Sequence, residues 1–185
     1  MCRKYFLCYM CILFLNGCVS NKKIIACENK IFKNYSSINR QQYLSLGEKV
    51  FKAPYDIVFS SIVTGISNMG IAIKNMEKES GYILAEGMDT RPMKIQKQTA
   101  EILVNELSKC GRTWEARLGN AIYSYSFNLK KYNNHIKVKL RISVVVNQNQ
   151  GTTLYSSFHP KLLETHYQHA WRNIEQQLFL DTHLD

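Results

Sequence analysis

The stretch Ile136–Val146 reads IKVKLRISVVV, and apolar residues alternate with charged ones over its first seven positions. Alternation with a period of two predicts a β-strand that has one face in a core and the other in solvent. The charged positions are Lys137, Lys139 and Arg141. A second strand is predicted over Ala121–Leu129, and the turn at 132–135 would join the two as a hairpin. This hairpin is the clearest element of the chain, and it requires an antiparallel sheet.

Further elements are predicted on both sides of this hairpin. In chain order they are a strand over Leu46–Lys52, a helix from Ala53-Pro54-Tyr55-Asp56 to Asn68-Met69-Gly70, a hairpin of Ile71–Asn75 and Tyr82–Glu86, and a helix over about Pro160–Leu180. Pro54 is tolerated in a first helical turn, and Gly70 is a typical C-terminal stop. Apolar residues recur at helical spacing in both helices. We therefore expect an α+β fold, in which an antiparallel sheet packs against an early helix and a long C-terminal helix.

The segment 95–118 leaves two structures open. The spacing of Ala100, Val104 and Leu107 favours a helix that ends at Gly111. Alternatively, Thr99–Leu107 and Thr113–Leu118 would pair as a hairpin.

The chain begins with features of an export signal. Arg3 and Lys4 precede the uncharged run Tyr5–Leu15, which is too short to cross a bilayer but fits the apolar region of a signal peptide. The run ends in Leu15-Asn16-Gly17-Cys18, which resembles the lipobox of bacterial lipoproteins, with Asn16 larger than the usual residue. The resemblance implies cleavage before Cys18 and lipidation of Cys18, and Val19 after the cysteine favours the outer membrane. A buried apolar helix and an uncleaved membrane anchor are the alternatives.

This interpretation divides the chain into three parts. Residues 1–17 are the signal peptide, 18–43 a lipidated N-terminus and flexible tether, and 44–185 a single α+β domain. Loss of Arg3 and Lys4 lowers the formal net charge from +10 to +8, because residues 1–17 contain no acid. Polar residues without an evident pattern predict coil from Val19 to about Gln42.

The same interpretation gives each of the six cysteines an expected role. Cys2, Cys8 and Cys11 would leave with the signal peptide, and Cys18 would carry lipid. Cys27 and Cys110 remain in the mature chain. An exported protein can keep a disulfide, but the sequence leaves open whether these two thiols pair.

The domain also resembles the helix-grip domains of Gram-negative lipoproteins, including those of the lipoprotein subunit of the β-barrel assembly machine. The stretches that carry the resemblance are Phe51–Phe59, Met69–Ile73 and Ser80–Ile83. They share an aromatic-rich helix start, a glycine after the helix and a glycine-aliphatic hairpin. The resemblance implies a fold, and a fold alone does not give a function.

Few residues are candidates for chemistry. His166 and His169 lie three apart with His159 upstream, but a metal site needs three or four ligands, so we expect a solvated or edge histidine at each position. The serines at 60–61 and 156–157 lack a nucleophile motif. The carboxylate pairs, Asp56 with Glu86 and Glu101 with Glu106, are better explained by a helix start and by exposed faces. We therefore predict no catalytic residue, no metal site, no cofactor and no enzyme activity.

The basic strand beside Tyr123, Tyr125 and Phe127 could in principle be a nucleic-acid platform. Core aromatics on one face with solvated lysines on the other explain the same pattern, so we expect no nucleic-acid partner. The function expected is a lipid-anchored envelope protein that is a non-catalytic accessory or scaffold in an envelope protein complex. It would bind partners through its exposed sheet face or a groove beside the last helix. The alternative is a periplasmic module that holds a small molecule or lipid between helix and sheet.

Overall fold

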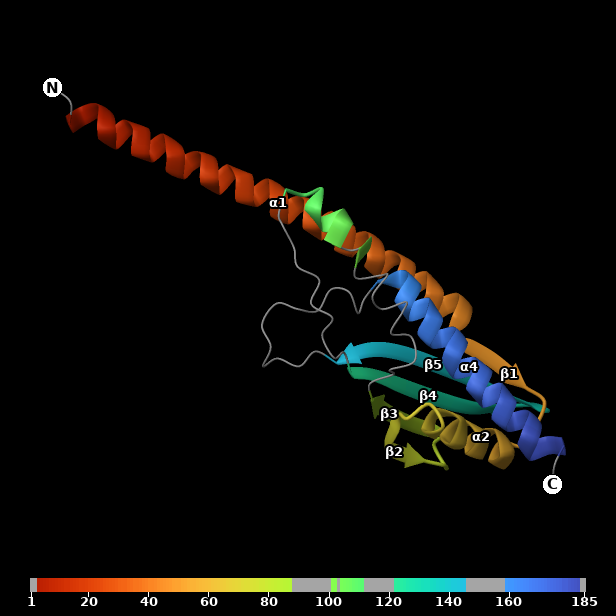
Figure 1. Ribbon diagram of the computed structural model, residues 1–185. Helices are drawn as coiled ribbons and strands as arrows, with labels where there is room; N and C mark the ends of the chain where they lie inside the picture. The colour runs from red at the N-terminus through yellow and green to blue at the C-terminus, as the bar shows by residue number, and fades with distance from the viewer. Residues whose placement is uncertain (1–2, 88–100, 103, 112–121, 146–158, 184–185) are drawn as a thin grey trace.

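The computed structural model of the chain describes residues 3–87, 101–102, 104–111, 122–145 and 159–183 (Figure 1). Its helices are α1 (Arg3–Leu46), α2 (Tyr55–Ser67) and α4 (Pro160–His183). Its strands are β1 (Glu48–Phe51), β2 (Ala72–Glu77), β3 (Tyr82–Gly87), β4 (Ile122–Tyr132) and β5 (His135–Val145). A short helical piece covers 101–102 and 104–108. The expected strands and helices are present, and the α+β class is confirmed.

The strands form one antiparallel sheet in the order β1-β5-β4-β3-β2. The predicted hairpin is its centre, where Tyr132 pairs with His135 at the turn and Ile122 with Val145 at the far end. Asn133 has a φ of 52°, a left-handed conformation that asparagine tolerates in tight turns. The predicted alternation holds, because Val138 and Leu140 are buried while Lys139 and Arg141 are exposed.

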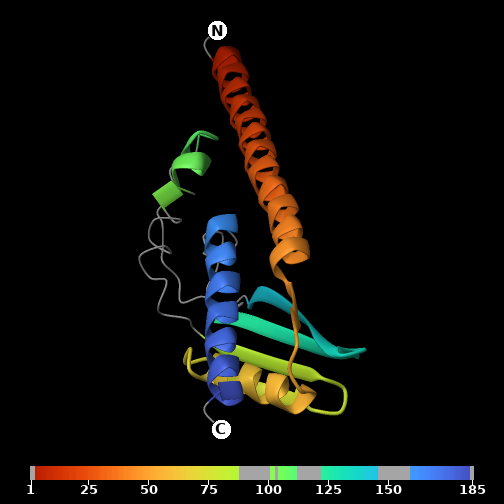
Figure 2. The same ribbon diagram turned by 90° about the vertical axis from the view of Figure 1, so that its right-hand side faces the viewer.

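Helices α2 and α4 lie side by side on one face of the sheet (Figure 2). Their close approach depends on Gly65, where an added Cβ would lie only 3.0 Å from the Cα of Ile174. Between helices and sheet lies what we call the main core. Its largest fully buried side chains are Ile62, Ile66, Ile71, Ile83, Tyr123, Tyr125, Phe127, Leu140, Leu162, Tyr167 and Ile174.

The coil prediction for Val19–Gln42 is wrong, because this stretch lies within α1. No glycine or proline occurs between Gly17 and Gly47, so nothing interrupts a helix there. The less exposed positions Ile24, Cys27, Ile31, Tyr35 and Ile38 recur every three or four residues, as expected for a helix with one packed side. This helical spacing is present in the sequence. It is weak, because each turn contributes only one or two apolar residues among many polar ones.

The ambiguity over 95–118 is resolved in part. The piece at 104–108 is helical, as the periodicity favoured, and Gly111 follows it with a φ of +90°. The alternative of a strand over Thr99–Leu107 is therefore wrong at 101–102 and 104–107. The paired strand Thr113–Leu118 lies outside the described residues.

Candidate functional site

The face of the sheet opposite α2 and α4 carries polar and basic side chains. Among the described residues, no helix lies on this face (Figure 2). Its members on β1, β4 and β5 are Glu48, Val50, Ser126, Asn128, Lys130, Lys137, Lys139 and Arg141. We call this set the outer face. On these three strands four cations stand against one acid, and Glu86 of β3 adds a second acid on the same side of the sheet, so the face presents net positive charge to a partner.

Glu48 lies between two of these cations. Its carboxylate oxygens are 2.6 Å from the Nζ of Lys137 and 3.9 Å from that of Lys139. All three side chains are about one-third exposed or more, so the pairs contribute at most about 1 kcal/mol each to stability. Their effect is to order the lysines at the β1 side of the face.

β1 is an edge strand, and an open groove runs beside it. The groove has a volume of about 600 Å³ and lies between residues 49–53 and the last two turns of α4. Val50 and Phe179 line it and are 55% and 59% exposed. Lys49 forms an ion pair with Glu175 and lies over the Trp171 ring at 5.6 Å. The groove beside the last helix that the sequence suggested is thus present, with apolar walls and a charged rim.

The aromatic side chains of β4 are not available for stacking with bases. Tyr123, Tyr125 and Phe127 are all in the main core, with at most 2% exposure. The interpretation of these aromatic side chains as core residues is therefore confirmed. The same rings, with Tyr167 and Trp171 from α4, fill the space between helix and sheet. A ligand held between helix and sheet would have to displace them.

The prediction of an exposed or edge histidine is wrong for His166, which is 1% exposed. Its Nδ1 lies 2.8 Å from the Tyr125 hydroxyl, and its ring is 3.9 Å from that of Tyr123. His169 is half-buried, as an edge position should be. Within the described ranges, no group of three or more His, Cys, Asp or Glu side chains could hold a metal ion.

His159 lies at the start of α4, away from the other two. It is buried, its Nδ1 accepts from the backbone N–H of Lys161, and its ring meets the Tyr35 ring at 5.1 Å. Burial lowers the pKa of His159 below 6.5, the nearby Glu106 opposes this shift, and Lys161 adds to it. The three histidines therefore do not converge on one site.

The remaining polar candidates are held by structural contacts. Asp56 pairs with Lys78 at 2.9 Å, and this contact lowers the pKa of the carboxyl. The Ser61 hydroxyl donates to the carbonyl of Ile57 and lies 2.5 Å from Asp181. The serines at 156–157 lie outside the described residues. None of the described contacts resembles a nucleophile beside a general base.

The first carboxylate pair is separated in the structure. Glu86 lies on β3 opposite Ala72 and Ser124, whereas Asp56 is bonded to Lys78 in the β2–β3 turn. The members of the other pair also differ. Glu101 is exposed, whereas Glu106 accepts a hydrogen bond from the Tyr35 hydroxyl.

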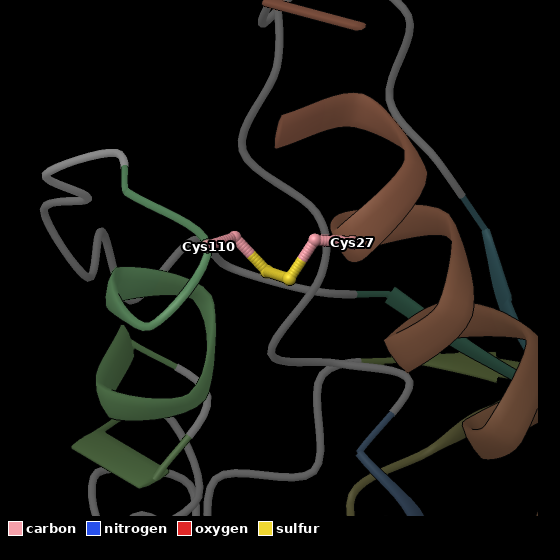
Figure 3. The surroundings of a disulfide bond; sticks show 2 residues. All are labelled: Cys27 and Cys110. Carbon is pink, nitrogen blue, oxygen red and sulfur yellow. A yellow bond between two sulfur atoms is a disulfide. The ribbon is translucent and has the colours of Figure 1, made fainter. Parts of the chain in front are cut away.

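Cys27 and Cys110 form a disulfide, with their Cα atoms 5.6 Å apart (Figure 3). The bond joins α1 to the short helical piece at 104–111 across 83 residues of sequence. Cys18, the predicted lipidation site, lies within α1 nine residues before Cys27.

A small apolar cluster lies beside the disulfide. It consists of Ile31, Phe32 and Tyr35 from α1 together with Leu107, and we call it the α1 cluster. The Tyr35 hydroxyl donates to the Oε2 of Glu106 at 2.6 Å. Burial and the negative charge of Glu106 raise the pKa of Tyr35, so this hydroxyl keeps its proton. Sequence reasoning missed Tyr35 and assigned Glu106 to an exposed face, and the two residues are 71 positions apart.

Among the helices of the described residues, none combines the length and apolar content that crossing a bilayer requires. No protein-family model matches the chain, and a comparison with curated proteins finds no match.

Proposed function

We propose that this protein is a lipid-anchored protein of the bacterial cell envelope, a non-catalytic accessory or scaffold that binds other envelope proteins. Cys18 would carry the lipid, and the outer face with the groove beside β1 would be the docking surface. The outer membrane is the expected location, from the resemblance of residues 15–18 to a lipobox followed by Val19.

The observation that carries this proposal is the Cys27–Cys110 disulfide. Disulfides persist in exported proteins and are rare where glutathione and thioredoxin keep thiols reduced. The bond and the signal-like N-terminus are independent features, and both favour export. The alternative of a ligand held between helix and sheet has less support, because aromatic side chains fill that space.

The form of α1 also fits an anchored protein. The helix from Cys18 to Leu46 is about 40 Å long at about 1.5 Å per residue. It would hold the domain away from the lipid head groups at a defined distance. The tether that we propose is therefore a helix and not a coil.

Substitution of Cys18 tests the anchor. We expect Cys18→Ala to abolish fatty-acid labelling and processing before residue 18, and to release the protein from the membrane fraction. Cys11→Ala is the matched control, because it makes the same substitution in the same segment and leaves both Cys18 and the Cys27–Cys110 disulfide intact. A Cys18→Ala protein that is still labelled, processed and membrane-bound would contradict the proposal.

Charge reversal tests the docking surface. We expect the triple variant Lys137→Glu, Lys139→Glu, Arg141→Glu to lose its crosslinked envelope partners at unchanged abundance. The control variant Lys22→Glu, Lys23→Glu, Lys30→Glu makes the same change of charge on exposed positions of α1. Loss of partners in both variants would show a net-charge effect, and retention in both would refute the outer face as the docking surface.

A further inference from the structure

We propose that the free edge of β1 is extended by a strand from the partner, an extended segment in which apolar residues alternate with acidic ones. This inference rests on the proposed function in two respects, namely that the protein binds other proteins and, for the choice of a different protein over a second copy, that Cys18 carries a lipid. It adds which part of the surface binds and what kind of segment is bound.

The backbone of β1 has hydrogen-bonding groups available for such a strand. The Leu140 N–H donates to the carbonyl of Gly47 at 2.7 Å, which fixes the phase of the β1–β5 ladder. In an antiparallel ladder the residues alternate, so the N–H and C=O groups of Glu48 and Val50 point away from β5. Among the described strands, β1 pairs with β5 alone. An added strand would bond to these outward groups.

The groove supplies a place for apolar side chains of the added strand. Alternate residues of that strand would point to the helix side of the sheet, where Leu178 and Phe179 line the groove beside Ala53. Phe179 is 59% exposed and stacks on His183 at 4.4 Å. An apolar residue placed here would cover exposed apolar surface on α4 and remove it from water, which favours binding.

The remaining residues of the added strand would point to the outer face. That face carries Lys137 and Lys139 near the edge, with Lys52 exposed at the end of β1. Glu48 is the acid between the first two lysines. Acidic side chains on the added strand therefore match the charge of this face better than basic ones do.

The opposite edge of the sheet is built differently. β2 has a register irregularity between Ile73 and Asn75, and it exposes Lys74 and Glu77. Bulges and charged residues both help sheet edges to resist pairing with another strand. Charged residues occur on both edge strands, including Glu48 and Lys49 of β1, so the bulge is the difference between the two edges. β1 has no such irregularity in its register. This contrast favours β1 as the edge that accepts a strand.

A second copy of this chain fits the edge less well. β1 continues in the general direction of α1 (Figure 1). A two-fold axis relating two antiparallel β1 strands would point the two α1 helices in opposite directions. Two lipids on Cys18 could not then enter the same membrane. The occupant is therefore a segment of a different protein.

Val50→Pro tests the proposal on the purified full-length protein. The Val50 N–H points away from β5, so proline removes an outward donor while the β1–β5 bonds remain. The probe is a fluorescent seven-residue peptide of alternating glutamate and valine, measured by anisotropy. We expect at least ten-fold weaker binding by Val50→Pro, and binding within about three-fold of the parent by the control Val50→Thr, which keeps the donor.

Hydrogen exchange then locates the bound strand. We expect the peptide to slow exchange at Glu48 and Val50, and not at β2. Equal binding by Val50→Pro and Val50→Thr, protection confined to β2, or no binding to the parent would each overturn the proposal. So would a concentration-dependent dimer that Val50→Pro abolishes, because the occupant would then be a second copy. The peptide assay does not depend on Cys18, so a failed lipid anchor and a failed β1 site are distinguishable.

Discussion

The main core and the α1 cluster are stabilised in different ways. The main core buries side chains from β1, β3, β4 and β5 and from α2 and α4 in one contiguous body, with the partly buried Ile73 of β2 packed against it. The α1 cluster buries only Tyr35 and Leu107, with Ile31 and Phe32 packed against them. A disulfide and one charge-assisted hydrogen bond accompany this small contact. The comparison shows that apolar burial maintains the domain, whereas covalent and polar links maintain the attachment of 104–111 to α1.

The largest expected effect is in the main core. Phe127→Ala removes a fully buried ring and should lower the free energy of unfolding by about 3–5 kcal/mol. Chemical denaturation followed by circular dichroism would measure this loss. Phe179→Ala removes the same side chain from an exposed position and should change stability by less than about 0.5 kcal/mol. Similar losses in the two variants would contradict the assignment of the core.

Cys110→Ser breaks the covalent link of the α1 cluster. Closure of a loop of this length contributes up to about 4.5 kcal/mol in the chain-entropy model. We expect hydrogen exchange to accelerate in 104–110 and in the facing turns of α1, while β4 and β5 keep their protection. Cys27→Ser should have the same effect, and the double variant should add nothing. Loss of protection throughout the sheet would show that the two regions are not separable.

Tyr35→Phe removes the hydroxyl and leaves the ring in the α1 cluster. Loss of this hydrogen bond to a carboxylate should cost about 1.5–3 kcal/mol or less, since Glu106 is only partly buried. Amide hydrogen exchange at 104–110 should accelerate when Tyr35→Phe is combined with Cys110→Ser. In that background the disulfide no longer masks the loss of the hydrogen bond. Tyr82→Phe on β3 is the matched control. An unchanged exchange rate would show that the hydrogen bond contributes nothing there.

Acidification should produce the smallest effect, at His159, whose ring contacts Tyr35 of the α1 cluster. Burial lowers the pKa of His159 below 6.5, so the folded state binds fewer protons than the unfolded state. The contribution of His159 is therefore complete above about pH 6.5 and is lost as the pH falls through the lowered pKa. Protection factors at 104–110, which correct for the pH dependence of intrinsic amide exchange, should fall below this pH in the parent and not in His159→Gln. A parent that is insensitive to pH between 7 and about 5 would contradict this.

The elements of the main core were predictable because their patterns are local. Alternation at Ile136–Ile142 and the helical spacing of residues 55–69 identify the buried faces directly. The α1 cluster was not predictable in the same way. Leu107 and Tyr35 lie 72 positions apart, and neither stretch shows a strong pattern by itself. The sequence predicted His166 at the edge of the apolar stripe of the last helix. Its burial is explained by its contacts with Tyr123 and Tyr125 of β4.

The docking surface was predictable in outline only. The basic alternation of β5 showed that one sheet face would be charged, and the last helix suggested a groove beside it. Which strand would form the sheet edge depends on pairing over long sequence distances, such as Glu48 with Lys139. The pairing of Cys27 with Cys110 was left open for the same reason, since spacing along the chain does not give the distance between Cα atoms.

The continuous helix of α1 has a consequence for orientation. A coil would let the domain rotate freely about its point of attachment, but a helix transmits rotation. One residue inserted into α1 before Cys27 turns everything that follows by about 100° and advances it by about 1.5 Å. A four-residue insertion adds about one turn and restores nearly the same direction. The direction in which the outer face points relative to residue 18 is therefore set by the number of residues between residue 18 and the domain. The length of the tether alone does not fix it.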